Sequence, residues 1–339
     1  MSAPLLALRG LVRDYGSGSA GRGKALRAVD NVSLTVKKGE IVGIVGESGC
    51  GKSTLARVVA ALDRPTEGQV LLNGEDLFAI GRRELVRRRD RFQMVFQDPY
   101  GSLDPRRRIG WSVAEPLGVL SPPLGKAETE RRVGEMLEAV GLRATDARRF
   151  PHEFSGGQRQ RIAIARALVT RPDLVIADEA VSALDLSVQA QVLNLILDLR
   201  ERYGVAFLFI THNLSVVEAI CDRVAVMYRG RTVETGATVD VFEAPRHPYT
   251  SLLLAAEPGR AAQAPDRGRS TPPFPGDGDD WNGCAFRPRC VAATQECRRA
   301  APAETSLAAP GEPDWLVACH HARDGPSAAL ASVDAAHRS

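Results

Sequence analysis

The amino-acid sequence predicts an α/β protein whose central sheet is largely parallel. Three short runs are continuously apolar, as expected for strands buried on both faces: IVGIVG, LVIA and FLFI at residues 41–46, 174–177 and 207–210. Segments with a helical pattern lie between these runs, over residues 52–62, 157–170 and 187–203. Strands that alternate with helices favour the α/β class. The 44% hydrophobic fraction is sufficient for a sizeable core.

The N-terminal part of the chain predicts further strands. Residues 5–15 and 25–45 form two extended stretches, separated by a Gly/Ser-rich loop at 16–21. Residues 69–77 predict a strand pair that turns at Asn73-Gly74, because this dipeptide favours the tight turn of a hairpin. The chain is therefore expected to begin with strands before the first predicted helix.

The middle of the chain mixes regular and irregular segments. The basic segment 82–91 is interpreted as a helix or a loop, and FQMVF at 92–96 as another buried strand. Residues 98–125 are rich in Pro and Gly and predict irregular structure. Residues 126–141 predict a helix that ends at Gly141, with one apolar face made of Val133, Met136, Leu137 and Val140.

The C-terminal third changes character. VAVMYRG at 224–230 predicts a final strand before a turn. Residues 256–283 are poor in large aliphatic residues and rich in Pro, Gly and Asp, and they predict a linker or an irregular tail. The 339 residues correspond to about two domains or one large one, at ~100–200 residues per domain.

The composition excludes several classes of protein. A formal net charge of +3 is too small to indicate nucleic-acid binding. No apolar run approaches the roughly 18 residues of a membrane-spanning helix, and the N-terminus does not resemble a secretory signal. We therefore expect a cytoplasmic protein that does not itself cross a membrane. Its six cysteines are then not expected to form a disulfide framework.

A glycine-rich segment after the first apolar run predicts a phosphate-binding loop. It fits the pattern G-x-x-x-x-G-K-[ST], with a buried strand before it and a helix after it. The backbone N–H groups of such a loop close around phosphates, and the helix N-terminus adds partial positive charge. Lys52 would reach the β- and γ-phosphates of a nucleotide, and Ser53 would ligate Mg²⁺. The candidate nucleotide-binding residues are Gly46, Glu47, Ser48, Gly49, Cys50, Gly51, Lys52, Ser53 and Thr54.

Two further motifs add to this loop. The apolar run at 174–177 ends in Asp178, which would hold the hydration shell of Mg²⁺, and Glu179, which would polarise the attacking water. Ser155, Gly156, Gly157 and Gln158 lie at the start of a predicted helix. Because a helix N-terminus is itself an anion site, the chain carries two phosphate-binding helix starts.

With these motifs the sequence resembles the ATP-binding-cassette (ABC) ATPases, whose signature motif is LSGGQ-like. The chain has Phe154 where that pattern commonly has Leu, and the resemblance covers about residues 5–240. It implies a P-loop NTPase fold with a RecA-like mixed sheet core, an antiparallel β subdomain and an α-helical signature subdomain. It also implies roles for four more residues: Gln97 as the Q-loop glutamine at Mg²⁺ and the γ-phosphate, Asp185 in the D-loop, His212 as the switch histidine and Tyr15 as the aromatic that stacks on adenine.

The family mechanism explains why two anion sites occur in one chain. ATP would bind the 46–54 loop of one cassette and the 155–158 segment of a second, homologous or identical cassette. Closure and reopening of this pair would then be the power stroke.

Three segments are similar to the ATPase subunits of oligopeptide/dipeptide importers, at residues 95–110, 178–199 and 247–256. This similarity implies two permease partners, contacted through 95–110, and indirectly an extracytoplasmic solute-binding protein. The subunit would be peripheral, at the cytoplasmic face of the cell membrane. Importers of nickel, glutathione or another small solute remain alternatives, as does a soluble ABC ATPase without a permease.

We expect an ABC ATPase domain at 1–245, with its helical subdomain at about 98–170, and a C-terminal extension at 246–339. A four-cysteine segment at 284–319 contains Cys284, Cys290, Cys297 and Cys319. It resembles the C-x-F-x-x-R-C tail of the peptide-importer ATPases, which implies a [4Fe–4S] cluster for some members. Four cysteines also suit tetrahedral zinc, and unmetallated thiols are the third alternative. The expected role is to staple a tail with little hydrophobic core.

Overall fold

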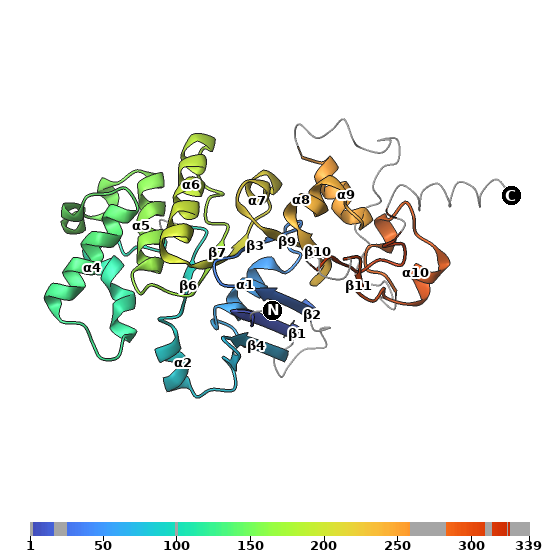
Figure 1. Ribbon diagram of the computed structural model, residues 1–339, viewed down its shortest axis with the longest axis horizontal. Coiled ribbons are helices and arrows are strands. Elements are labelled where there is room, and N and C mark those ends of the chain that lie inside the picture. The colour runs from blue at the N-terminus through green and yellow to red at the C-terminus, as the bar shows by residue number, and fades with distance from the viewer. Residues whose placement is uncertain are drawn as a thin grey trace.

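The computed structural model describes residues 3–16, 26–98, 101–257, 283–308, 314–323 and 325. Its strands form two sheets (Figure 1). A four-stranded antiparallel sheet has the order β2-β1-β4-β5. An eight-stranded main sheet has the order β11-β12-β10-β9-β3-β8-β7-β6, in which β9, β3, β8, β7 and β6 are parallel. The mixed α/β class is therefore confirmed.

The strands are numbered in the order in which they occur along the chain. Their bounds are β1 Leu6–Tyr15, β2 Leu26–Val36, β3 Ile41–Val45, β4 Glu67–Leu72, β5 Glu75–Asp76, β6 Phe92–Val95, β7 Leu174–Asp178, β8 Ala206–Ile210, β9 Arg223–Tyr228, β10 Arg231–Ala237, β11 Thr305–Ser306 and β12 Leu316–Val317. The last two strands lie in the C-terminal tail, and β12 pairs with β10, so the tail extends the main sheet.

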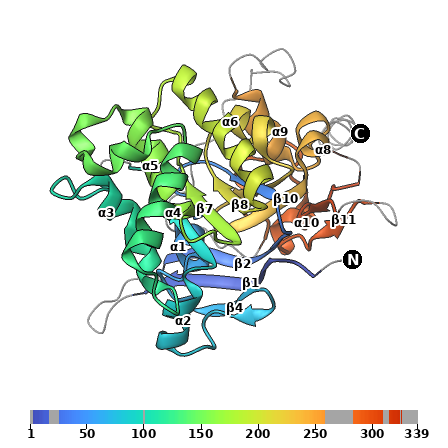
Figure 2. The ribbon, with the colours of Figure 1, turned by 60° about the vertical axis from the view of Figure 1, so that its left-hand side comes forward.

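The helices gather around the main sheet. Their bounds are α1 Lys52–Val59, α2 Arg82–Arg88, α3 Ile109–Ala114, α4 Lys126–Ala139, α5 Gly156–Leu168, α6 Leu186–Tyr203, α7 Leu214–Ile220, α8 Thr238–Glu243, α9 Pro248–Ala255 and α10 Gln295–Arg299. Figures 1 and 2 place α4 and α5 beyond the β6 and β7 edge of the main sheet, and α10 and β11 at the opposite end. None of the helices in the described part of the chain has the length and apolarity needed to cross a membrane.

The core has two halves, one on each face of the main sheet. Successive residues of β3 alternate between them: Ile41 packs into one half, and Val42 into the other. In β8 the same alternation separates Phe207 from Leu208. Since neighbouring side chains of a strand point to opposite faces and both faces are covered, every position must be apolar. This explains the continuous apolar runs of the sequence.

Most of the predicted elements are confirmed, including the helix α4 with its buried face and the hairpin between β4 and β5. At that hairpin Asn73 has a φ of 50° and Gly74 a φ of 83°, as its tight turn requires. The basic segment 82–91 contains the helix α2. The loop predicted at 16–21 and the linker predicted at 256–283 lie almost entirely outside the described residues.

Three expectations were wrong in detail. Residues 98–125 are not irregular throughout, because Ile109, Val113 and Leu117 recur every four residues and bury one face of α3 and the short 3₁₀ helix at 115–119 that follows it. The strand β9 is not the last, since β10 forms a hairpin with it and the tail adds β11 and β12. The extended stretch 25–45 divides between the two sheets, with β2 in one and β3 in the other.

Candidate functional site

The 46–54 loop joins the carboxyl end of β3 to the start of α1. Two of its glycines lie where a side chain cannot fit. A Cβ atom on Gly46 would lie 2.2 Å from the carbonyl oxygen of Met227, and one on Gly51 would lie 2.2 Å from that of Ala28. Gly51 also has a φ of 107°, which L residues rarely adopt. The glycines therefore allow the loop to turn tightly against two neighbouring segments of backbone.

Lys52, the first residue of α1, lies inside the curve of this loop. Its side chain is buried, and its Nζ atom donates hydrogen bonds to the carbonyl oxygens of Gly46 at 2.7 Å and Glu47 at 2.9 Å. A buried ammonium group requires such partners. Phosphate oxygens entering the loop would offer this ammonium acceptors that carry full negative charge.

Ser53 and Asp178 bring two oxygen donors together at the end of the loop. The Ser53 hydroxyl donates to Asp178 Oδ1 at 3.3 Å. Burial raises the pKa of Asp178, the Ser53 hydroxyl lowers it, and the nearby charge of Glu179 raises it further. A positive charge beside this carboxylate would therefore stabilise its ionised form. A hydroxyl and a carboxylate fit Mg²⁺, which commonly binds through one or two protein oxygens together with substrate phosphates.

Side chains from two other segments contact the Glu179 carboxylate. Gln97, just after β6, donates its Nε2 hydrogen to Glu179 Oε2 at 2.9 Å, and His212, just after β8, lies with Nδ1 3.1 Å from Glu179 Oε1. Glu179 itself has a φ of 48°, and its N–H donates to the carbonyl oxygen of Ile210 at 2.8 Å. Left-handed backbone at a non-glycine residue is costly, by about 1–3 kcal/mol, and such strain concentrates at functional sites. The carboxyl ends of three neighbouring strands thus aim polar groups at one place.

The segment at 155–158 lies away from the 46–54 loop, because α5 is separated from α1 by β6 and β7 in Figure 1. Ser155 caps α5: its hydroxyl accepts from the N–H of Gln158 at 3.4 Å, while the Gln158 side chain accepts from the N–H of Ser155 at 3.0 Å. Asp185 caps α6 by accepting from the N–H of Val188 at 3.0 Å. A Cβ on Gly157 would lie 2.3 Å from a methyl carbon of Val188, so the two helix starts pack together.

Tyr15, at the end of β1, is half-exposed and engaged locally. Its hydroxyl donates to Asp63 Oδ2 at 2.8 Å, and the Arg13 guanidinium lies 4.6 Å from its ring centroid. Arg13 also forms an ion pair with Asp63 at 2.7 Å. The adenine-stacking role of Tyr15 stays a prediction.

Sequence reasoning missed a contact between the loop and the C-terminal tail. Both oxygens of the Glu47 carboxylate accept hydrogen bonds from Arg289, each at 2.8 Å, and the Glu47 N–H donates to the hydroxyl of Tyr249 at 3.0 Å. The contact joins residues 242 positions apart in the chain. The motif C-x-F-x-x-R-C, which contains Arg289, was the only sequence signal, and it says nothing of the partner.

Comparison with known proteins decides the family. Residues 29–182 match the family model described as ABC transporter. The dipeptide transport ATP-binding protein DppF of Haemophilus influenzae is 45% identical over 304 residues, which cover 89% of this chain and 93% of that protein. This chain belongs to the ABC transporter family. It is an ATP-binding subunit of that family and an ATPase.

Other relatives of this ABC subunit have similar names. A probable peptide ABC transporter ATP-binding protein of Sinorhizobium fredii is 46% identical over 330 residues, or 94% of this chain and 90% of that one. Among solved structures, the dimeric ATP-binding cassette MJ0796 bound to ADP and Pi has a TM-score of 0.61 at 30% identity, covering 69% of this chain and 98% of that chain. CbiO1 of Clostridium perfringens, part of the transporter complex cbiONQ, has a TM-score of 0.63 at 26% identity, covering 77% and 98%. The ABC cassette fold is thereby confirmed.

The tail of this ABC subunit includes the four-cysteine segment. Residues 233–297 match the model described as oligopeptide/dipeptide transporter, C-terminal region. Burial raises the pKa of Cys290 to about 12, with smaller contributions from the charges of Cys284, Cys319 and Cys297, and burial likewise raises the pKa of Cys319 to about 11. Among the described residues, no three His, Cys, Asp or Glu side chains are grouped so as to hold a metal ion, and the expected iron–sulfur or zinc site is not supported.

Proposed function

We propose that this ABC subunit powers the import of peptides, most specifically dipeptides or oligopeptides, by hydrolysing ATP. One observation carries the ATPase chemistry: Ser53 donates to Asp178 at the carboxyl edge of the main sheet, and the next residue, Glu179, contacts Gln97 and His212. The solute class is supported by the C-terminal region model and by the names of the relatives.

The site residues divide the chemistry among them. Lys52 and the N–H groups of the 46–54 loop bind the phosphates. Ser53, Asp178 and Gln97 would hold Mg²⁺, which when bound neutralises the charge of the phosphate oxygens. Glu179 orients the attacking water and accepts its proton, and His212 holds the Glu179 carboxylate in place.

A second cassette, homologous or identical, completes each site. The start of α5 is a capped helix N-terminus that lies away from α1 in its own chain, so it is available to a nucleotide held by another chain. The similar fold of the dimeric cassette MJ0796 supports this arrangement. ATP draws the two cassettes together, and hydrolysis releases them.

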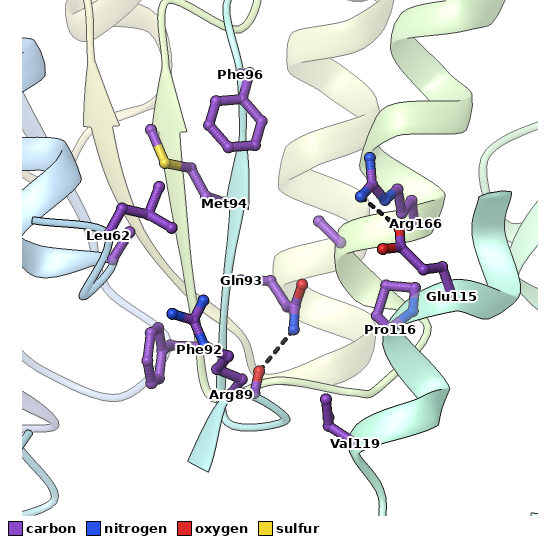
Figure 3. A pocket seen from close by; sticks show the side chains of 12 residues that line it. Leu62, Arg89, Phe92, Gln93, Met94, Phe96, Glu115, Pro116, Val119 and Arg166 are labelled. Carbon is purple, nitrogen blue, oxygen red and sulfur yellow. Dashed lines mark hydrogen bonds and ion pairs between the residues drawn. The ribbon is translucent and has the colours of Figure 1, made fainter. Parts of the chain in front are cut away.

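A groove beside β6 is the proposed docking place for a permease subunit, which would hold the protein at the cytoplasmic face of the membrane (Figure 3). The groove has a volume of about 280 Å³ and lies between β6 and the helical segments that carry Glu115 and Arg166. Leu62 and Phe96 line it and are about two-fifths exposed, and Arg166 donates to Glu115 at 2.6 Å on its helical side. Leu62→Glu should therefore reduce co-purification with permease subunits from detergent-solubilised membranes. An extracytoplasmic solute-binding protein would deliver the solute to these permeases.

The iron–sulfur cluster is a separate proposal, supported by the chemistry of the four cysteines within residues 284–319 and not by their geometry. Bound zinc and unmetallated thiols are the two alternatives to the cluster. Iron, sulfide and zinc content after anaerobic purification tests it, with the Cys297→Ser variant as comparison. Protein that contains neither iron nor zinc would refute both metal proposals.

The ATPase proposal is tested by Glu179→Gln in the purified transporter. Hydrolysis should fall by about 10²–10⁴-fold, the usual contribution of a general base, while ATP still binds. Glu138→Gln makes the same exchange on the exposed face of α4 and serves as the control. A Glu179→Gln rate equal to wild type would exclude Glu179 as the base. Uptake of labelled dipeptide, nickel and glutathione by a deletion strain then separates the solute classes.

A further inference from the structure

An acidic side chain lies in a loop built to bind anions. Glu47 is the second residue of the 46–54 loop, and its carbonyl oxygen is one of the two that hold the Lys52 ammonium. A carboxylate on this loop would repel the phosphates of ATP bound there, because like charges oppose each other more strongly where water is partly excluded. A positively charged group must neutralise this carboxylate for the loop to favour ATP.

The C-terminal tail supplies this positive charge. Arg289 binds the Glu47 carboxylate with two parallel hydrogen bonds of 2.8 Å, the bidentate geometry in which guanidinium–carboxylate pairs are strongest. The Arg289 side chain is only 10% exposed and that of Glu47 is 32% exposed, so water screens the pair less than it would on the surface. The paired carboxylate also raises the pKa of Arg289, which keeps the guanidinium charged.

Packing fixes Arg289 in this position. Its guanidinium lies 5.8 Å from the ring centroid of Tyr228 and 5.9 Å from that of Phe286. Tyr228, Phe286 and Tyr249 form one buried aromatic cluster, with ring centroids 4.6–5.5 Å apart. The hydroxyl of Tyr249, a member of this cluster, accepts a hydrogen bond from the Glu47 N–H. The tail thus holds both the backbone and the side chain of one loop residue.

We infer that Arg289 is a positioning residue for ATP: it neutralises Glu47 and fixes the first turn of the nucleotide loop. This inference rests on the proposal that the 46–54 loop binds ATP. It makes the C-terminal tail a contributor to nucleotide affinity.

The test measures the affinity of the purified full chain for a fluorescent ATP analogue with Mg²⁺. Arg289→Gln should weaken binding by about tenfold or more, since it leaves Glu47 charged and unpaired. The double variant Glu47→Gln/Arg289→Gln should recover most of the lost affinity, because it removes the repelling charge as well. A role in packing alone predicts no such recovery, since the double variant still lacks the guanidinium between the rings.

Two controls separate the possible failures. Arg287→Gln removes a guanidinium from the same turn without touching the contact with Glu47, and its affinity should equal wild type. Lys52→Ala should abolish ATP binding. If it does not, the result contradicts the proposal that the 46–54 loop binds ATP, and this failure is distinct from a failure of the inference about Arg289. Arg289→Lys preserves the charge without the fork and should bind with intermediate affinity, which provides a folded variant if Arg289→Gln misfolds. Wild-type affinity in Arg289→Gln, or no recovery in the double variant, would overturn the inference.

Discussion

Acidification should destabilise this protein through one buried histidine. His247 caps α9: its ring Nδ1 accepts from the backbone N–H of Tyr249 at 3.0 Å, and its backbone N–H donates to Glu234 Oε2 at 2.9 Å. Complete burial lowers its pKa from 6.5 to about 3. The folded state therefore resists protonation that the unfolded chain accepts, and stability that is fully present above pH 6.5 is lost as the pH falls toward 3.

The size of the loss follows from these values. Each pH unit below the unfolded pKa costs about 1.4 kcal/mol, so the free energy of unfolding should fall by about 2 kcal/mol between neutral pH and about pH 5. The His247→Asn variant is the comparison, because an Asn oxygen can accept the same N–H without titrating. Burial also raises the pKa of Glu234, which changes the pH dependence of stability in the opposite direction. Because Glu234 is present in both proteins, its effect cancels in the comparison.

Urea unfolding of wild type and His247→Asn at both pH values provides the measurement. The difference in free energy of unfolding between the two proteins should shift by about 2 kcal/mol in favour of the variant on acidification. Equal pH dependence in both proteins would refute the reasoning, since the histidine would then titrate alike in the folded and unfolded states.

Three further substitutions test the fold by urea unfolding. Leu137→Ala should cost about 2–5 kcal/mol, because the side chain is fully buried in the core of the helical segment, and a loss below about 1 kcal/mol would contradict that packing. Asn73→Val should cost about 1–2 kcal/mol, since a β-branched residue resists the φ of 50° at this turn, and an unchanged midpoint would argue against the turn. Trp315→Phe removes the 3.0 Å hydrogen bond from Trp315 Nε1 to the buried Glu234 carboxylate and should cost about 1–3 kcal/mol; a neutral result would indicate that Glu234 is satisfied without the tail.

The parts of the fold that could be predicted are those encoded locally. The strands β3, β7 and β8 are buried on both faces, so their residues form unbroken apolar runs that the sequence displays directly. The 46–54 loop is likewise a local pattern. Because parallel strands end at one edge of a sheet, the placement of Asp178, Glu179 and His212 near that loop follows from their positions just after strands.

The parts that could not be predicted depend on distant partners. The strand β10 escaped notice because its buried positions include Thr232, Glu234 and Thr235, and a polar run does not indicate a buried strand. Its polar side chains are tolerated there because specific residues elsewhere, such as Trp315, satisfy them. The same holds for Glu47, whose partner Arg289 is identified only once the chain has folded.

These distant contacts make the tail part of the ATPase rather than an appendage. The strand β12 pairs with β10, and Trp315 just before β12 binds Glu234 of β10. Glu234 also accepts the N–H of His247, which caps the helix that carries Tyr249, and Tyr249 holds the nucleotide loop at Glu47. A continuous series of hydrogen bonds therefore runs from the tail to the loop, in parallel with the direct contact of Arg289. Loss of Trp315 and Arg289 would take one hydrogen bond from the buried Glu234 carboxylate and the guanidinium partner from Glu47, so both stability and ATP affinity should depend on the tail.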